Sequence, residues 1–415
     1  MKSRFLKQEI LAVNNSPFSR IIVLTGARQT GKTTLAQHCF PEFSYLSIED
    51  PVLRLDYKQL TAGQWKALYP HAILDEVQKE PALIESIKSV YDQYNDVRYV
   101  LLGSSQLLLL NKVKESLAGR CTIKEVLPLT LPEMLSSSWD EQPAPSWFQN
   151  FIKSLKRPDM LPSFKLHPEF ARKTKAFQYY LKNGGYPALV DDSLTDVQRF
   201  DWLKTYVRTY LERDVRDLAD FRSLEPFVKI QRITALMTGQ LVNYSQLGNE
   251  AAVSSKTAGR FLNYLGLSYQ TILLQPWFSN SLKRLVKSPK LHYLDPGVQR
   301  AILQKTGDMS GNEFESAVVA EIYKQFKVTG INGSFYHLRT HDGAEVDLLL
   351  EVEEGFIAFE IKMSENITKK DARHLLNLPN ILNKPVIQSF ILSNDTAVKQ
   401  FNENITALPA SMFLT

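Results

Sequence analysis

Eight consecutive residues near the start of the chain have the types and spacing of a phosphate-binding loop. The segment 26–33 reads GARQTGKT and matches the pattern G-x-x-x-x-G-K-[ST]. Its glycines let the backbone turn so that N–H groups converge on phosphate oxygens. Lys32 would add a positive charge for the β and γ phosphates, and the Thr33 hydroxyl is the expected Mg²⁺ ligand. The expected loop comprises Gly26, Ala27, Arg28, Gln29, Thr30, Gly31, Lys32, Thr33 and Thr34.

The residues on either side of this loop favour the same interpretation. The apolar run 21–24 reads IIVL and predicts a short buried strand. Residues 34–37 open a helix whose positive N-terminus would face the phosphates. The alternative is a glycine-containing turn that matches the pattern by chance, but such a turn needs no strand before it and no helix after it. We therefore expect ATP to bind here, with Mg²⁺.

A second acidic element follows about forty residues later. The segment 71–76 reads HAILDE, an apolar strand that ends in two carboxylates. Next to a phosphate-binding loop, Asp75 would hold the Mg²⁺ shell and Glu76 would orient and deprotonate the attacking water. A strand ending in a solvated acidic turn is the alternative, and the spacing from the loop favours the catalytic interpretation.

Two later strand boundaries carry further polar candidates. The strand expected at 97–102 ends in Gly103-Ser104-Ser105, where a hydroxyl would contact the γ-phosphate or would simply cap the next helix. Arg120 stands before a strand expected at 122–127. It is a candidate arginine finger, acting within its own chain or across a subunit boundary in a homo-oligomer. A surface cation is the alternative for Arg120.

The C-terminal region contains a candidate metal site on two strands. Segments 345–350 and 356–363 read EVDLLL and FIAFEIKM, and alternation places Glu360 and Lys362 on one face of their strand. A hairpin through the short turn Glu353-Glu354-Gly355 would bring Asp347 beside them. Glu315, on a helix expected at 313–326, would lie alongside.

The spacing of Asp347, twelve residues, Glu360 and Lys362 resembles the active-site pattern of the restriction-endonuclease-like superfamily. The resemblance implies Mg²⁺ bound by Asp347, Glu360 and Glu315, and a lysine that assists phosphodiester cleavage. Glu345-Val346 stand before the aspartate where the pattern has a proline. Two amphipathic strands with a solvated ionic face, or a binding-only relic of the site, are the alternatives.

A basic region precedes this domain. Residues 222–290 contain nine basic and two acidic residues, an excess larger than the net charge of +5 of the whole chain. Within it, 244–251 and 256–265 predict two helices joined by a turn, with Ser254 or Ser255 capping the second. This is helix-turn-helix patterning, which favours DNA contact or, alternatively, a protein-contact module. The expected phosphate contacts are Lys256, Arg260, Lys283 and Arg284.

The elements that carry these candidate sites predict an α/β chain of several domains. Strands that alternate with helices predict a parallel-sheet P-loop domain at 1–135. A Ser- and Pro-rich linker insertion and a helical lid follow at 136–220, where Asn183-Gly184-Gly185-Tyr186-Pro187 breaks two helices. A winged-helix-like unit is expected at 221–300, and an α/β restriction-endonuclease-like domain at 305–415.

Composition narrows the class of protein. The chain has 415 residues, 44% of them hydrophobic and 22% charged, which is ordinary for globular protein. The only two cysteines, Cys39 and Cys121, are too few for a disulfide framework and lack metal-ligand spacing. No signal segment or membrane span is predicted, because the longest apolar stretch, 100–110, is short and interrupted by polar residues. A cytoplasmic location is expected.

The order GARQTGKT, ILDEVQ, LLGSS, LAGR and PLTLPE resembles a prokaryotic family of AAA+ type ATPases. The resemblance implies ATP hydrolysis, a middle region similar to a winged helix and a C-terminal region of largely unknown function. Three functions follow as hypotheses. The chain is a DNA-engaging ATPase with a nuclease-like domain, a nucleotide-controlled switch or scaffold, or an ATPase-gated defence or toxin-like nuclease.

Overall fold

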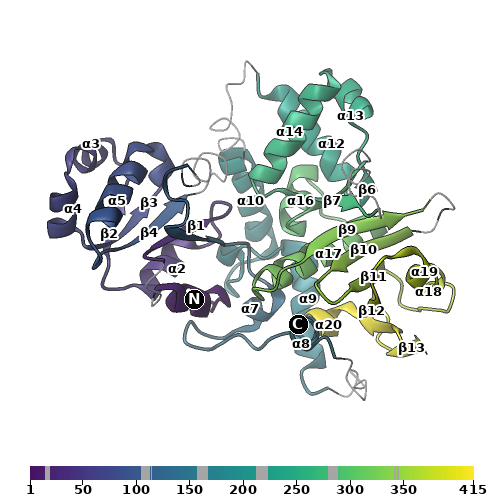
Figure 1. Ribbon diagram of the computed structural model, residues 1–415. Coiled ribbons are helices and arrows are strands. Elements are labelled where there is room, and N and C mark those ends of the chain that lie inside the picture. Colours follow the sequence, from purple (N-terminus) through teal and green to yellow (C-terminus); the bar gives the residue numbers. More distant parts are fainter. Residues whose placement is uncertain are drawn as a thin grey trace.

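The computed structural model describes most of the chain. The described residues are 1–14, 19–103, 113, 115–156, 167–211, 223–278, 288–340, 343 and 345–415. Four residues singled out above, Ser104, Ser105, Lys283 and Arg284, lie outside the described residues. Figure 1 shows two sheet-containing lobes, the N-terminal one in purple and blue and the C-terminal one in green and yellow.

The N-terminal lobe contains a five-stranded parallel sheet with the order β2-β3-β4-β1-β5. Strand β1, which lies between β4 and β5, is apolar from Ile21 to Leu24 and buried at every position, because helices cover both faces of the sheet. The sheet confirms the parallel α/β fold predicted for this region. Its strands are β1 Ile21–Thr25, β2 Ser44–Ser47, β3 His71–Asp75, β4 Arg98–Gly103 and β5 Cys121–Glu125.

Local capping determines where several helices of this lobe begin. The Asp50 side chain accepts hydrogen bonds from the N–H groups of Val52 and Leu53, and Pro51 occupies the first turn. Thr61 and Gln64 form a capping box at the next helix. The helices are α1 Leu6–Asn14, α2 Lys32–Cys39, α3 Pro51–Gln59, α4 Ala62–Leu68, the 3₁₀ turn η1 Val77–Lys79, and α5 Ala82–Gln93.

A helical segment connects the two lobes. Its longest helix, α9, lies between the N-terminal sheet and the C-terminal lobe (Figure 1). The glycine-rich break expected at 183–187 is present and leads into a 3₁₀ turn. The elements are α7 Leu131–Leu135, α8 Trp147–Ser154, α9 Phe170–Asn183, η3 Pro187–Leu189, α10 Asp196–Tyr206 and the π-helical turn η4 Val207–Leu211.

The middle region has the order helix, strand, helix, helix, strand, strand, helix. Ser254 caps the second helix of the expected pair by accepting a hydrogen bond from the N–H of Thr257, as predicted. Leu247, Ala258 and Phe261 contribute to its small core. The elements are α12 Glu225–Leu236, β6 Gln240–Leu241, α13 Tyr244–Glu250, α14 Ser255–Leu267, β7 Thr271–Pro276, β8 Lys290–Tyr293 and α16 Pro296–Leu303.

The C-terminal region continues the sheet of the middle region. β7 pairs in parallel with β9 through Gln275–Tyr336 and Pro276–His337, which gives the order β13-β14-β12-β11-β10-β9-β7-β8-β6. The boundary expected near residue 300 is therefore not a break in this sheet. The elements are α17 Gly311–Lys327, β9 Ser334–Arg339, β10 Glu345–Glu351, β11 Phe356–Lys362, α18 Arg373–Leu376, α19 Leu378–Ile381, β12 Val386–Ser393, β13 Lys399–Asn402, β14 Ile405–Pro409 and α20 Ala410–Leu414.

Helix α17 ties the two lobes together through a buried ion pair. Lys324 Nζ lies 2.7 Å from a carboxylate oxygen of Glu321, and both side chains are completely buried. The same ammonium donates to the carbonyl of Leu129, and Glu321 accepts from the N–H of Leu131, on the segment leaving the N-terminal sheet. Each charge satisfies a backbone group of the other lobe, so neither charge can be removed alone without leaving a buried polar group unpaired.

We expect Lys324→Met to lower the free energy of unfolding by about 3–5 kcal/mol, because the Glu321 charge stays buried without its partner. Urea unfolding of the full chain measures this loss. Lys327→Met is the matched control, since Lys327 is exposed on the same helix and its removal should cost less than about 1 kcal/mol. Equal losses in the two variants would contradict the proposed importance of the pair.

Candidate functional site

The segment between β1 and α2 forms a compact loop whose shape depends on glycine. Gly26, Gln29 and Gly31 all have positive φ, at 149°, 63° and 86°. A β-carbon on Gly26 would stand 2.2 Å from the carbonyl oxygen of Val126, which follows β5. The first glycine is therefore required by close packing of the loop against the neighbouring strand end as well as by its dihedral angle.

Lys32 lies folded over this loop. Its Nζ donates to the carbonyl oxygens of Gly26 at 2.9 Å and Ala27 at 2.8 Å, and the residue is 7% exposed. The Thr30 hydroxyl closes the loop by donating to the Ala27 carbonyl. The ammonium group therefore lies at the loop's own rim, within reach of an anion that enters the loop.

Thr33 and Asp75 meet at the carboxyl edge of the parallel sheet. The Thr33 hydroxyl donates to Asp75 Oδ2 at 2.6 Å, and the Tyr45 hydroxyl donates to the same oxygen at 2.9 Å. Asp75 is the last residue of β3, whereas Thr33 is in the first turn of α2. A hydroxyl and a carboxylate at this distance are hard oxygen donors, so these residues fit the Mg²⁺ ion that the loop implies.

Glu76 adopts a left-handed backbone conformation with φ of 56°, which is strained for a residue with a side chain. Its carboxylate lies 3.6 Å from the guanidinium of Arg28 in the loop and also accepts a hydrogen bond from Gln78. The turn thus directs Glu76 back toward the loop. A cavity of about 210 Å³ opens among these groups and is lined by Arg28, Gln29, Gly31, Lys32, Thr33, Thr34, Asp75 and Glu76.

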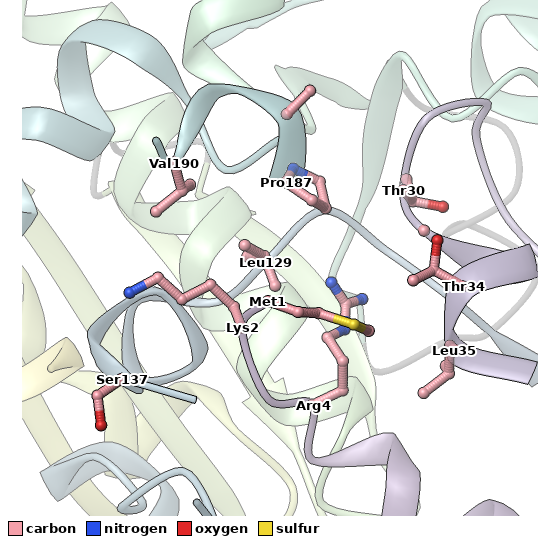
Figure 2. Close-up of a pocket in the computed structure, with 12 residues that line it drawn as sticks. Met1, Lys2, Arg4, Thr30, Thr34, Leu35, Leu129, Ser137, Pro187 and Val190 are labelled. Carbon is pink, nitrogen blue, oxygen red and sulfur yellow. The ribbon is translucent and has the colours of Figure 1, made fainter. Parts of the chain in front are cut away.

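A second cavity of about 350 Å³ lies beside the first, on the other side of Gly31 and Thr34. Figure 2 shows the Met1 side chain extending toward Thr34 and Leu35. The residues Leu35, Leu129, Pro187 and Val190 make part of its lining apolar. The sequence analysis missed this cavity, because its walls come from four separate segments of the chain.

The glycine-rich segment 183–187, which had no assigned role, lies against the loop. Pro187 Cγ is 3.9 Å from where a β-carbon on Gly31 would stand. Asp295, at the start of α16, accepts a hydrogen bond from the N–H of Gly185 at 2.8 Å and would overlap a β-carbon on Gly184. The Tyr206 hydroxyl donates to the carbonyl of Arg28 at 3.2 Å. The helical segment that connects the two lobes therefore contacts the phosphate-binding loop directly.

Arg120 does not lie near this loop in its own chain. It precedes β5, whose first residue pairs with the first residue of β1, at the edge opposite the loop. Its guanidinium pairs with both carboxylate oxygens of Asp92 at 2.7 and 3.1 Å. The interpretation as an arginine finger acting within the chain is therefore wrong, because a whole strand separates the two ends. Only the surface-cation or trans-acting alternatives remain.

The C-terminal candidates do come together. The predicted hairpin is confirmed by antiparallel pairing of Leu348 with Phe359. Asp347 Oδ2 accepts the N–H of Ile361 at 2.9 Å, and Lys362 lies 2.6 Å from Glu360 and 4.0 Å from Asp347. All of this lies on one side of the hairpin.

A residue that the sequence analysis did not select completes the cluster. The Nζ of Lys290, on β8, lies 2.7 Å from Glu315, 3.1 Å from Asp347 and 3.3 Å from Glu345. Its side chain is 3% exposed, so Lys290 is not available for the nucleic-acid contact implied by counting it in the basic region. We call Lys290, Glu315, Glu345, Asp347, Glu360 and Lys362 the carboxylate–lysine cluster.

The buried charges shift the pKa values of the cluster. Burial, reinforced by the Asp347 charge, raises the pKa of Glu315 and of Glu360 to about 8. Burial alone would lower the pKa of Lys290, but the carboxylates of Asp347 and Glu315 outweigh it and raise that pKa. Burial lowers the pKa of His292 well below its ordinary value, which favours the neutral imidazole. The ring lies 3.8 Å from Glu315.

The Mg²⁺ site predicted from Asp347, Glu360 and Glu315 does not fit this arrangement. Among the residues that the structure describes, no three His, Cys, Asp or Glu side chains are grouped so that they could hold a metal ion. The Lys290 ammonium lies between Glu315 and Asp347, in the space that a shared cation would need. The carboxylates are gathered as predicted, but a lysine occupies their centre.

The candidate nucleic-acid residues divide into two groups. Lys256 and Arg260 are exposed and lie one turn apart on α14. Lys283 and Arg284 belong to the part of the chain that the structure does not describe. Of the four candidate contacts, the structure therefore describes only Lys256 and Arg260, both on α14.

Comparisons with known proteins agree with the N-terminal geometry. Residues 18–135 match the family described as AAA domain. Residues 174–308 and 310–413 match two families described as Domain of unknown function, DUF8612 and DUF4143. The N-terminal region is therefore similar to AAA domains, and its parallel sheet and glycine-containing loop are consistent with a P-loop NTPase domain.

Relatives are similar over most of the chain. Uncharacterized protein Rv2008c of Mycobacterium tuberculosis is 27% identical over 356 residues, which are 82% of this chain and 70% of that protein. Uncharacterized protein MJ1544 of Methanocaldococcus jannaschii is 25% identical over 349 residues, 80% and 72% of the two chains. The solved Walker-type ATPase PABY2304 of Pyrococcus abyssi aligns with a TM-score of 0.42 at 15% identity, covering 72% of this chain and 94% of that one.

Among the described residues, no helix has the length and apolar character needed to cross a lipid bilayer.

The cluster predicts a specific pH dependence. A carboxyl with a higher pKa in the folded protein keeps its proton on folding, so its contribution to stability falls as pH rises from the ordinary value of 4.5 to about 8. Glu360→Gln removes one such group, and its Tm should fall less between about pH 5 and about pH 8.5 than that of the wild type. For a chain of 415 residues, each 1 kcal/mol corresponds to roughly 1 °C.

Differential scanning calorimetry at the two pH values measures this difference. Glu354→Gln is the matched control, because Glu354 is exposed in the turn of the same hairpin. If the Tm of Glu360→Gln changed with pH by as much as that of the wild type, Glu360 would already be ionised in the folded protein at both pH values.

Proposed function

We propose that the N-terminal domain binds ATP with Mg²⁺ and hydrolyses it slowly. The observation that carries the proposal is the convergence of Lys32, Thr33, Asp75 and Glu76 on one cavity at the carboxyl edge of the sheet. This is the edge at which parallel α/β sheets bind their ligands. The match of this region to the AAA domain family supports the same activity.

Each residue of the cavity has a separate role in the proposal. The N–H groups of the loop and the ammonium of Lys32 bind phosphate oxygens, and Thr33 and Asp75 hold Mg²⁺, which would neutralise phosphate charge. Glu76 accepts the proton of the attacking water. Its contact with Arg28 holds the carboxylate at the rim of the loop.

The larger neighbouring cavity supplies a place for the base. Its volume of about 350 Å³ and the apolar surfaces of Leu35, Leu129, Pro187 and Val190 suit a purine ring. The cavity adjoins the loop at Gly31 and Thr34, so one nucleotide can occupy both. The segment around Pro187 would then contact the base from outside the ATPase domain.

We expect Glu76→Gln to lower kcat for ATP by about 10²–10⁴-fold while nucleotide binding persists, because only the proton acceptor is lost. A coupled phosphate-release assay measures the rate, and fluorescence of a nucleotide analogue measures binding. Glu85→Gln, at an exposed position of α5, is the control and should hydrolyse at the wild-type rate.

Lys32→Ala should instead weaken nucleotide binding itself, because the charge that meets the phosphates is removed. If Glu76→Gln hydrolysed ATP as fast as the wild type, the role assigned to Glu76 would be refuted.

A second proposal, DNA contact by the middle region, has a specific observation in its favour. Lys256 and Arg260 are exposed on one face of α14, the second helix of a pair. The element order of α12, β6, α13, α14, β7 and β8 is compatible with a winged helix. A nucleotide-controlled switch or scaffold, in which α14 contacts a protein instead, is the alternative.

We expect low-salt DNA binding whose log affinity falls with log salt with a slope of about −4, for four or five phosphate contacts. Replacing Lys256 and Arg260 with Ala should reduce this slope by about 2. Fluorescence anisotropy with labelled duplex DNA measures it. Lys153→Ala with Lys175→Ala removes the same charge from exposed sites on α8 and α9 and should leave the slope unchanged. Absence of low-salt binding by the wild type would favour the protein-contact alternative.

A further inference from the structure

The carboxylate–lysine cluster draws its central cation from outside the C-terminal hairpin. Asp347 is on β10, Glu360 and Lys362 are on β11, and Glu315 is on α17. Lys290 comes from β8, on the far side of β7 and β9 in the sheet order. The cluster is therefore assembled across the boundary between the middle and C-terminal regions.

The geometry around Lys290 is that of a satisfied ammonium. Three carboxylates, those of Glu315, Asp347 and Glu345, lie 2.7–3.3 Å from Nζ. Nζ donates hydrogen bonds to Asp347 and Glu345 and forms an ion pair with Glu315, so the three side chains share the charge of one ammonium. Nitrogen-to-oxygen distances of this length are normal for such bonds, whereas Mg²⁺ needs oxygens at about 2.0–2.1 Å. The cluster is thus spaced around a nitrogen.

The backbone of Lys290 is held on both sides. It pairs with Leu241 of β6 and with Leu274 of β7 in an antiparallel arrangement. Only the side chain can withdraw from the cluster, and that side chain is 3% exposed. Withdrawal would move a buried charge away from three carboxylates, so the ammonium is a permanent part of the cluster.

We propose that Lys290 is the resident cation of this cluster and takes the place of a divalent metal ion. The carboxylates of Glu315 and Asp347 share its charge, so the native protein holds no Mg²⁺ or Mn²⁺ there. The C-terminal region accordingly does not cut nucleic acid through a metal at these residues. Removing the charge of Lys290 converts the same carboxylates into a divalent-cation site.

The proposal separates this cluster from two simpler interpretations. If the carboxylates were a metal site that the Lys290 side chain occupies only when no metal is bound, divalent cations would displace the lysine in the native protein. If it were only a structural ion pair, loss of the lysine would leave carboxylates unable to bind a metal. Titration of the wild type with a divalent cation tests the first interpretation. The same titration of a variant without the lysine tests the second.

The experiment titrates nucleotide-free full-length protein with Mn²⁺, followed by the electron paramagnetic resonance of the free ion. Lys290→Gln keeps hydrogen-bond donors but removes the charge, and it should bind one additional Mn²⁺ at least about tenfold more tightly than the wild type does. Adding Asp347→Asn to this variant should abolish the gain. Mn²⁺ that binds at Thr33 and Asp75 is common to the wild type and all variants, so it does not affect the difference between them.

Two controls isolate the position of the lysine. Lys290→Arg keeps the charge and should gain no Mn²⁺ site. Lys305→Met removes a lysine that lies 2.7 Å from Glu313 on the same helix as Glu315, and it should gain none either.

Wild-type binding of Mn²⁺ that Asp347→Asn removes would overturn the proposal, and this arm does not depend on the folding of Lys290→Gln. A folded Lys290→Gln protein without additional Mn²⁺ would overturn it as well. Neither outcome affects the proposed ATPase, whose residues lie in the other lobe.

Discussion

The arrangement of the two lobes depends on one chain of buried hydrogen bonds. Asp295 accepts the N–H of Gly185, whose carbonyl accepts the N–H of Leu129 at 2.7 Å. The carbonyl of Leu129 accepts the ammonium of Lys324, which is paired with Glu321. Each member is satisfied only if all the others are in place, and a buried polar group without a partner is costly. The exit from the ATPase sheet, the glycine-rich segment, α16 and α17 are therefore held in one arrangement.

This network also sets the distance between the two charged sites. The glycine-rich segment continues into Pro187, which borders the phosphate-binding loop. On the other side, Asp295 directly follows the strand segment that begins with Lys290 at the cluster. The structure thus provides a short covalent and hydrogen-bonded connection between the loop and the cluster.

Elements with local causes were predictable. The strand–loop–helix unit around Lys32 follows from an apolar run, two glycines and a helix start, all within fourteen residues. The hairpin that joins Asp347 to Glu360 follows from alternation and a short turn, residues 352–355 in the structure. The Ser254 cap follows from a hydroxyl placed before a helical pattern. In each case the residues that decide the structure are neighbours in the chain, so pattern and propensity contain the answer.

Features that join distant segments were not predictable in this way. Lys290 was counted as one of several basic residues, because nothing in its neighbourhood shows that its strand will lie beside carboxylates from α17 and β10. Arg120 was selected as a candidate arginine finger from its position before an expected strand, yet strand register puts it at the edge opposite the phosphate-binding loop. The sequence by itself determined the chemistry of the phosphate-binding loop and the identity of the clustered carboxylates. Only the tertiary structure decided which cation those carboxylates receive, because long-range strand pairing, and not local pattern, selects the neighbours of a buried charge.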